Sequence, residues 1–201
     1  MTSPFSPLRG KLKVEMDCWN GRGGDVNSFA LVSYLCDPLA EFLNRLRRDL
    51  VPECVAKAHV TVLPPRPLRS SPEEAWQEVQ EHLHNFQPFR AELGEIAIFP
   101  GFQAVYLSIA TGCQELERMH ATLNTGRLAW EEPFPYHPHL TLAQELAPQE
   151  LAAAMELAAG RWREFPHPRR FTVEKLTFVQ NTLENRWTDL AAMDLASHVT
   201  L

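Results

Sequence analysis

Two short stretches of the chain share a pattern of a histidine, an apolar residue, a threonine and a second apolar residue. The first stretch starts at His59 and contains Thr61, and the second starts at His139 and contains Thr141. Such strict alternation among β-branched and aliphatic residues predicts a β-strand. Because residues i and i+2 of a strand point to the same face, each stretch places an imidazole beside a hydroxyl and turns its apolar residues to the other face.

These side chains are suited to acid–base chemistry. An imidazole changes its charge near pH ~6.5, so a histidine can accept or donate a proton at neutral pH. Two imidazoles facing each other, each beside a hydroxyl donor, would form a chemical site. A single histidine in a strand is more often structural, and threonine is common in strands. The prediction of an enzyme therefore depends on the duplication of the pattern.

The two stretches also resemble the paired motifs of a known family. Both copies, and in particular the second with Pro138 directly before its histidine, are similar to the motifs of the 2H phosphoesterases. This superfamily includes RNA 2′,3′-cyclic phosphodiesterases and bacterial 2′-5′ RNA ligases. The surroundings agree, since an apolar strand and a helix precede the first copy. The similarity extends from about residue 27 to the end of the sequence.

The resemblance implies a metal-independent phosphodiesterase that opens 2′,3′-cyclic phosphates of RNA ends or small nucleotides, with 2′-5′ RNA ligation as a related activity. His59 and His139 would be the catalytic acid and base, and Thr61 and Thr141 would bind the phosphate. No metal or cofactor is implied. Which histidine is the base, and which ribose oxygen is released, stays open. Two alternatives also stay open: a non-catalytic RNA- or nucleotide-binding module on the same fold, and a phosphodiesterase for a non-RNA cyclic metabolite.

Four further residues are candidates for substrate contact. Lys57 lies two residues before the first motif and would share its face, where an ammonium could contact a phosphate. Tyr136 precedes the second motif and could bond a phosphate or stack on a base. Phe102 and Tyr106 lie in a predicted hairpin and offer aromatic surface for a nucleobase, although core packing would also explain them.

Three other polar residues are weaker candidates or have no assigned role. We expect His137 to point away from His139 once the strand has begun. Arg66 follows two prolines and could reach the rim of the cleft, but an exposed loop charge is the default expectation. His120 is isolated in the sequence and is assigned no role.

The sequence predicts alternating helices and strands around these motifs. Asp37 and Pro38 predict a helix N-terminus, and Ser71 with Glu74 predicts a capping box at another. The predicted helices cover 37–50, 71–86, 113–124 and 148–159, and the predicted strands cover 29–35, 58–65, 89–99, 103–109, the second motif, 171–180 and 186–195.

This order is a quasi-repeat, and it predicts an α+β protein. Together with the resemblance, it implies a bilobal duplicated fold of two antiparallel sheets with outer helices around a central cleft. We predict a flexible N-terminal extension over residues 1–26, which is rich in proline and glycine, and a 2H phosphoesterase-like domain of two pseudo-symmetric lobes over residues 27–201.

Composition limits the class of protein. Of the 201 residues, 45% are hydrophobic and 22% are charged, as in ordinary globular proteins. The net charge of −6 argues against broad non-specific binding of nucleic acid, but leaves a locally basic RNA site open. No apolar run approaches the ~20 residues of a membrane span, and four scattered cysteines indicate reduced thiols. We therefore expect a cytoplasmic monomer.

Overall fold

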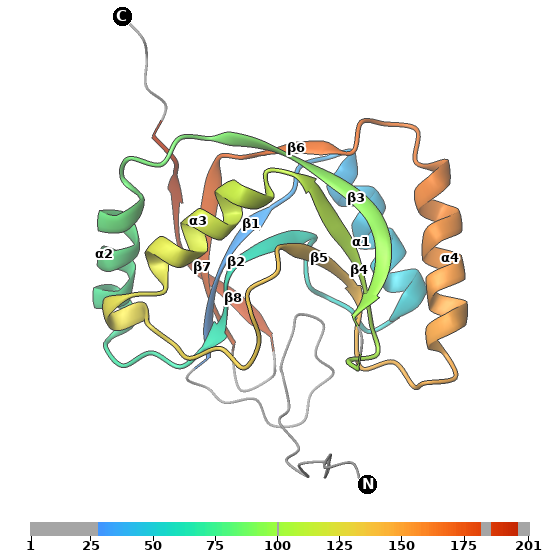
Figure 1. The fold of residues 1–201 in the computed structure, drawn as a ribbon, viewed down its shortest axis with the longest axis horizontal. Coiled ribbons are helices and arrows are strands. Elements are labelled where there is room, and N and C mark those ends of the chain that lie inside the picture. The colour runs from blue at the N-terminus through green and yellow to red at the C-terminus, as the bar shows by residue number, and fades with distance from the viewer. Residues whose placement is uncertain (1–27, 100, 182–185, 197–201) are drawn as a thin grey trace, which may run out of the picture.

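The computed structural model describes residues 28–99, 101–181 and 186–196. Within these ranges the chain forms two four-stranded sheets and four α-helices (Figure 1). The strands are β1 Phe29–Tyr34, β2 His59–Arg66, β3 Phe89–Phe99, β4 Ala104–Thr111, β5 His139–Ala143, β6 Arg170–Val173, β7 Lys175–Asn181 and β8 Trp187–Asp194. The helices are α1 Leu39–Leu50, α2 Pro72–Leu83, α3 Cys113–Leu123 and α4 Leu151–Glu164, with a 3₁₀ turn, η1, at Gly126–Leu128. The predicted extension over 1–26 lies outside the described residues, and its boundary stays a prediction.

Both sheets are antiparallel, and each has a motif strand at its edge. The first sheet has the order β2-β1-β7-β8 and the second has the order β5-β4-β3-β6. Cα atoms of β2 and β5 come within 8 Å of one another, and Figure 1 shows these two strands side by side in the middle of the molecule. The α+β class and the two antiparallel sheets are confirmed, while the cleft between them stays a prediction.

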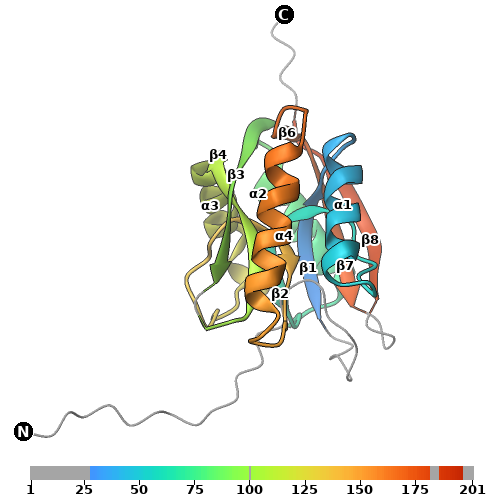
Figure 2. The same ribbon diagram turned by 90° about the vertical axis from the view of Figure 1, so that its right-hand side faces the viewer.

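The helices link the two sheets together. Helix α1 connects two strands of the first sheet, yet it packs against β5 of the second sheet and beside α4 (Figure 2). Helix α3 connects two strands of the second sheet, yet it packs against β2 of the first. Each motif strand is thus in contact with a helix that belongs, in chain order, to the other sheet.

The apolar residues of the motif strands lie in a core shared by both sheets. Val60 and Val62 of β2, and Leu140 and Leu142 of β5, have no exposed surface and belong to one continuous buried cluster. This confirms the prediction that the apolar positions of each motif are buried behind the polar ones. Burial of each such side chain contributes about 1.5–3 kcal/mol, which holds each strand in its register.

The single strand predicted over residues 171–180 is wrong, because the structure has two strands there. Residues 171–180 do not form a single strand, because β6 pairs with β3 in the second sheet whereas β7 pairs with β1 and β8 in the first. The two strands meet at Glu174, whose carbonyl accepts a hydrogen bond from the amide of Leu195 at 2.7 Å. Glu174 and Lys175 are both exposed, so the alternation of buried and exposed residues breaks where the chain changes sheets.

The helix termini agree in part with the prediction. Ser71 caps α2, with its hydroxyl accepting from the Glu74 amide at 3.2 Å and the Glu74 carboxylate accepting from the Ser71 amide at 3.1 Å. Helix α1 starts at Leu39, so Pro38 and not Asp37 is its N-cap, although the Asp37 carboxylate accepts from the Glu41 amide at 3.0 Å.

Helix α4 lies later in the sequence than predicted. It starts at Leu151 and extends past Gly160, because Trp162 in its last turn is buried in the core. Among the described residues, no helix combines the length and the apolar character needed to cross a membrane.

Candidate active site

His59 begins β2, and its backbone holds the ring in a defined orientation. The residue is paired with Tyr34 of β1 and is 9% exposed. Its Nδ1 atom lies 2.6 Å from the carbonyl oxygen of Lys57, and its ring meets the ring of Tyr34 edge-on at 6.1 Å. A carbonyl can only accept, so Nδ1 carries the proton and the lone pair of a neutral ring lies on Nε2.

His139 begins β5 in the same way. It is paired with Ser108 of β4, and its Nδ1 atom lies 2.6 Å from the carbonyl oxygen of His137. In both motifs, therefore, the imidazole donates to the carbonyl two residues earlier. The two histidines share one tautomer, which leaves Nε2 of each ring as the atom able to accept a proton.

The two threonines lie two residues further along each strand. Thr61 is paired with Val32 and is partly exposed, whereas Thr141 is paired with Tyr106 and is 6% exposed. The alternation of the strands puts each hydroxyl on the same face as the histidine of its own motif.

Tyr136 connects the two motifs. Its hydroxyl donates a hydrogen bond of 2.7 Å to the carbonyl oxygen of Thr61, so the residue three positions before His139 is bonded to the first motif strand. Burial, and the nearby acidic groups of Cys113 and Glu132, raise the pKa of Tyr136 well above its usual value, so the phenol stays neutral and keeps its proton. The substrate contact predicted for Tyr136 would have to involve its ring, since the hydroxyl proton is already donated.

Lys57 lies beside His59 but faces a carboxylate. Its Nζ atom is 3.5 Å from Oδ2 of Asp189 and 4.9 Å from the ring centroid of Tyr34, and the Tyr34 hydroxyl donates to Oδ1 of Asp189 at 2.6 Å. Sequence reasoning missed Tyr34 and Asp189. Asp189 lies far away in the chain, on β8, and no local pattern connects it to His59.

Two side chains of helix α1 form hydrogen bonds with the backbone directly before His59. The guanidinium of Arg47, which is 1% exposed, donates at 3.1 Å to the carbonyl of Lys57 that also accepts from His59. The Asn44 side-chain oxygen accepts from the amide of Ala58 at 2.6 Å. Both contacts hold the backbone that orients the His59 ring.

An aromatic cluster surrounds the second histidine. The ring of Phe99 lies 4.8 Å from that of His139 and 3.9 Å from that of Tyr106, and Tyr106 lies 5.6 Å from His139. His137 joins this cluster at 6.3 Å from His139, so the expectation that it points away was wrong. The strand begins only at His139. Had it included His137, residues two apart would also have shared a face, and the sequence-based expectation overlooked that spacing.

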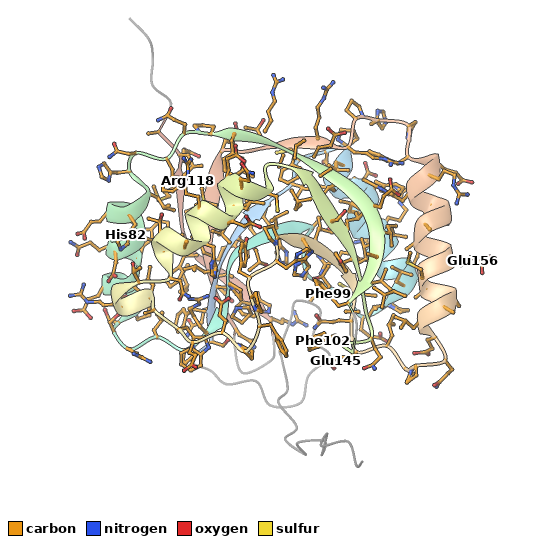
Figure 3. The ribbon with its side chains drawn as sticks, in the orientation of Figure 1. His82, Phe99, Phe102, Arg118, Glu145 and Glu156 are labelled. Carbon is orange, nitrogen blue, oxygen red and sulfur yellow. The ribbon has the colours of Figure 1, made fainter. Side chains whose placement is uncertain are left out.

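Phe102 lies next to this cluster but contacts a different partner. Its amide donates to the Phe99 carbonyl at 3.2 Å, and both residues lie at the same end of the β3–β4 hairpin (Figure 3). Its ring meets that of Phe134 edge-on at 4.9 Å, and the two residues are 37% and 48% exposed. The structure thus brings Tyr106 against His139 and leaves Phe102 on the surface beside the site.

Arg66 is not the exposed loop charge that was predicted, and His120, which was assigned no role, contacts the same carboxylate as Arg66. Arg66 is 3% exposed and forms an ion pair with Glu132, whose Oε1 atom also lies 2.8 Å from Nε2 of His120. Burial alone would raise the pKa of Glu132, but His120 and Arg66 outweigh it and hold that pKa below its usual value. The proline pair before Arg66 suggested a loop, but β2 continues through both prolines.

Within the described ranges, no group of three or more His, Cys, Asp or Glu side chains is arranged to hold a metal ion. The two motifs offer two imidazoles in matched tautomers and two hydroxyls. Together they can transfer protons and donate hydrogen bonds to an anion.

Comparison with known proteins identifies the family and the fold. Residues 36–185 match the family described as the 2'-5' RNA ligase superfamily. A search of curated proteins found no match. Among solved structures, a phosphoesterase and Escherichia coli LigT complexed with 3'-AMP each superimpose with a TM-score of 0.59 at 16% identity, over 86% of this chain and 100% of theirs.

A third similar structure is a conserved protein of unknown function from Agrobacterium tumefaciens. It superimposes with a TM-score of 0.52 at 13% identity, over 84% of this chain and 87% of its own. At such low identities, these similarities establish the fold.

Proposed function

Since the chain belongs to the 2'-5' RNA ligase superfamily of 2H phosphoesterases, we propose that it is a phosphodiesterase that opens 2′,3′-cyclic phosphates of RNA ends or small nucleotides. His59 and His139 are the acid–base pair in this proposal, and Thr61 and Thr141 bind the phosphoryl oxygens. The main support is the repeated bond from Nδ1 to the carbonyl two residues earlier, because it prepares both Nε2 atoms for proton transfer.

The proposed reaction is an in-line displacement at phosphorus. One Nε2 removes a proton from water as the water oxygen bonds to phosphorus, while the protonated Nε2 of the other histidine gives its proton to the departing ribose oxygen. The Nδ1–H bond to a carbonyl stabilises each ring when it is cationic. The threonine hydroxyls donate to the non-bridging oxygens, where negative charge increases in the transition state. Which histidine acts as base depends on which side the water enters.

The substrate is a nucleotide in this proposal. Escherichia coli LigT, which shares the fold, has been solved in complexes with 3'-AMP and with ATP. The net charge of −6 favours a short RNA end or a mononucleotide over a long RNA. A small non-RNA cyclic metabolite is the second candidate, supported by the same charge. Ligation of 2′-5′ ends would be the same kind of ring opening, in which the 5′-hydroxyl of a second ribose attacks phosphorus in place of water and the 3′ oxygen leaves with the proton.

The test is hydrolysis of a 2′,3′-cyclic mononucleotide, a short RNA ending in a cyclic phosphate and a non-RNA cyclic phosphate, with EDTA present. We expect turnover by the wild type. We expect His59→Ala and His139→Ala each to lower kcat by about 10²–10⁴-fold, the usual contribution of a general acid or base. His167→Ala, at an exposed position before β6, is the matched control and should keep full activity.

Loss of less than tenfold in both histidine variants would contradict the catalytic assignment. Binding of 3'-AMP without turnover of any substrate would instead support a nucleotide-binding module. Turnover that stops with EDTA would contradict the metal-free mechanism.

A further inference from the structure

We infer that Tyr136, His120 and Glu132 are positioning residues that hold the second motif at a set distance from the first; this inference rests on the proposed function. All three lie in or against residues 129–138, the bridging segment that leads from η1 to β5. Tyr136 is partly buried, His120 is 9% exposed, and the Glu132 side chain is 12% exposed. No proton-transfer step of the proposed reaction uses them.

The first anchor of the bridging segment is the ion pair between Glu132 and Arg66. Arg66 is the last residue of β2, and its Nη2 atom donates to Oε1 of Glu132. Its Nη1 atom donates to Oδ1 of Asn124 at 2.7 Å and to the carbonyl of Leu128 at 3.0 Å, both just before the bridging segment. The last residue of the first motif strand is therefore hydrogen-bonded to several residues of the chain between α3 and the second motif.

The second anchor is the hydrogen bond that the Tyr136 hydroxyl donates to the carbonyl oxygen of Thr61. Strand β2 is an edge strand, and the Thr61 carbonyl accepts from a side chain, at 2.7 Å. The Tyr136 ring stacks on the His120 ring with centroids 4.0 Å apart and planes 2° apart. His120 in turn has its Nε2 atom 2.8 Å from Oε1 of Glu132, the oxygen that Arg66 also contacts. A carboxylate can only accept, so His120 donates this bond.

These contacts form a closed circuit that starts and ends on β2. It leads from Arg66 through Glu132, His120 and Tyr136 back to Thr61. His139 follows Tyr136 by three residues, so the circuit fixes the second histidine relative to the strand that carries the first.

A role in geometry explains this circuit better than a role in stability. A buried ion pair is weak support for stability, because the cost of desolvation offsets much of the attraction. In-line displacement, in contrast, requires both Nε2 atoms at defined positions around phosphorus. A displacement of about 1 Å can lower the rate ~10²-fold.

The test compares Tyr136→Phe with Trp162→Phe. The first change removes the hydroxyl bond to Thr61 and keeps the ring that stacks on His120. The second removes a bond of similar burial to a carbonyl, from Trp162 Nε1 of α4 to Gly94 of β3 at 2.9 Å. We expect kcat to fall by about 10–10²-fold in Tyr136→Phe with KM changed by less than about threefold. Trp162→Phe should keep kcat within about twofold, although both variants lose thermal stability.

Glu132→Gln is the second variant, in case Tyr136→Phe does not fold. It keeps the shape of the side chain and removes the charge that holds Arg66 and His120 together. We expect the same loss in kcat with little change in KM. A variant that lost only stability, with kcat of the folded protein unchanged, would overturn the inference.

A second readout does not depend on turnover. The imidazole Cε1–H signals of His59 and His139, assigned by NMR with the two alanine variants, should shift in Tyr136→Phe and not in Trp162→Phe. If the wild type opens no cyclic phosphate, the proposed function fails, but these shifts still report the positioning. Signals that stay in place in Tyr136→Phe, or that move equally in Trp162→Phe, would overturn the inference.

Discussion

At the scale of single residues, backbone carbonyls set the orientation of the two candidate histidines. His59 and His139 each donate from Nδ1 to the carbonyl two residues earlier, at 2.6 Å. This bond selects the tautomer and restrains rotation of the ring, so neither histidine needs a carboxylate partner for its orientation. Arg47, buried beneath the carbonyl of Lys57, adds a second donor in the first motif.

The threonine hydroxyls are predicted to contribute less than the histidines. Thr61→Val and Thr141→Val keep the branched shape of each side chain, and we expect each to lower kcat by about 10–10³-fold because one donor to the phosphoryl oxygens is lost. Steady-state kinetics on a 2′,3′-cyclic mononucleotide measure this effect. Thr172→Val, at an exposed position on β6, should have no effect. Unchanged rates in both site variants would show that the threonines serve only the strands.

Glu132 should make stability depend on acid pH. Because its pKa in the folded protein lies below the usual value, its ionised form stabilises the fold above the ordinary glutamate pKa of ~4.3. That contribution is lost as the pH falls from there through the lowered pKa.

We therefore expect Glu132→Gln to be less stable than the wild type at pH 7, and to show a smaller loss of unfolding free energy on acidification. Urea titrations at several pH values measure this, with Glu156→Gln on the outer side of α4 as control (Figure 3). The prediction would be contradicted if the wild type and Glu132→Gln lost the same unfolding free energy on acidification.

At the scale of elements, two edge strands carry the site and a hairpin borders it. Strands β2 and β5 are held by their buried apolar faces and by helices that cross from the other sheet, so the polar face of each motif is supported by rigid structure. The β3–β4 hairpin brings Phe99 and Tyr106 against His139 and exposes Phe102 beside them.

This hairpin predicts a preference for substrate length. If Phe102 and Phe134 stack on a base next to the reacting nucleotide, Phe102→Ala should lower kcat/KM for a dinucleotide cyclic phosphate by about 5–150-fold, since stacking on an aromatic ring is worth ~1–3 kcal/mol per base. The effect on a mononucleotide should stay below about twofold. Leu157→Ala, at an exposed apolar position of α4, is the control. Equal effects on the two substrates would contradict a second base site.

At the scale of the whole molecule, the two sheets are not two halves of the chain. The first sheet combines β1 and β2 with the C-terminal strands β7 and β8, and the second contains the strands between them. One buried cluster reaches both sheets. The candidate site lies where an edge strand of each sheet meets the other, so its geometry depends on the packing of both sheets and of the helices that link them.

Much of the local structure could be predicted from the sequence. Alternation identified both motif strands and their buried faces, the capping box at Ser71 located α2, and the duplicated motif indicated the superfamily. Each of these signals depends on residues close together in the chain, whose periodicity decides which side chains share a face.

Contacts between distant residues were decided only by the tertiary structure. The alternation over 171–180 could not show that β6 and β7 join different sheets, since hydrogen-bond partners are chosen by packing. Nor could it show that Arg66 is buried against Glu132, or that Tyr136 spans from one motif to the other. The sequence by itself determined which side chains could transfer protons and which faces they occupy. Only folding brought the two faces together, because their relative position depends on a core and on buried polar contacts that join residues far apart in the chain.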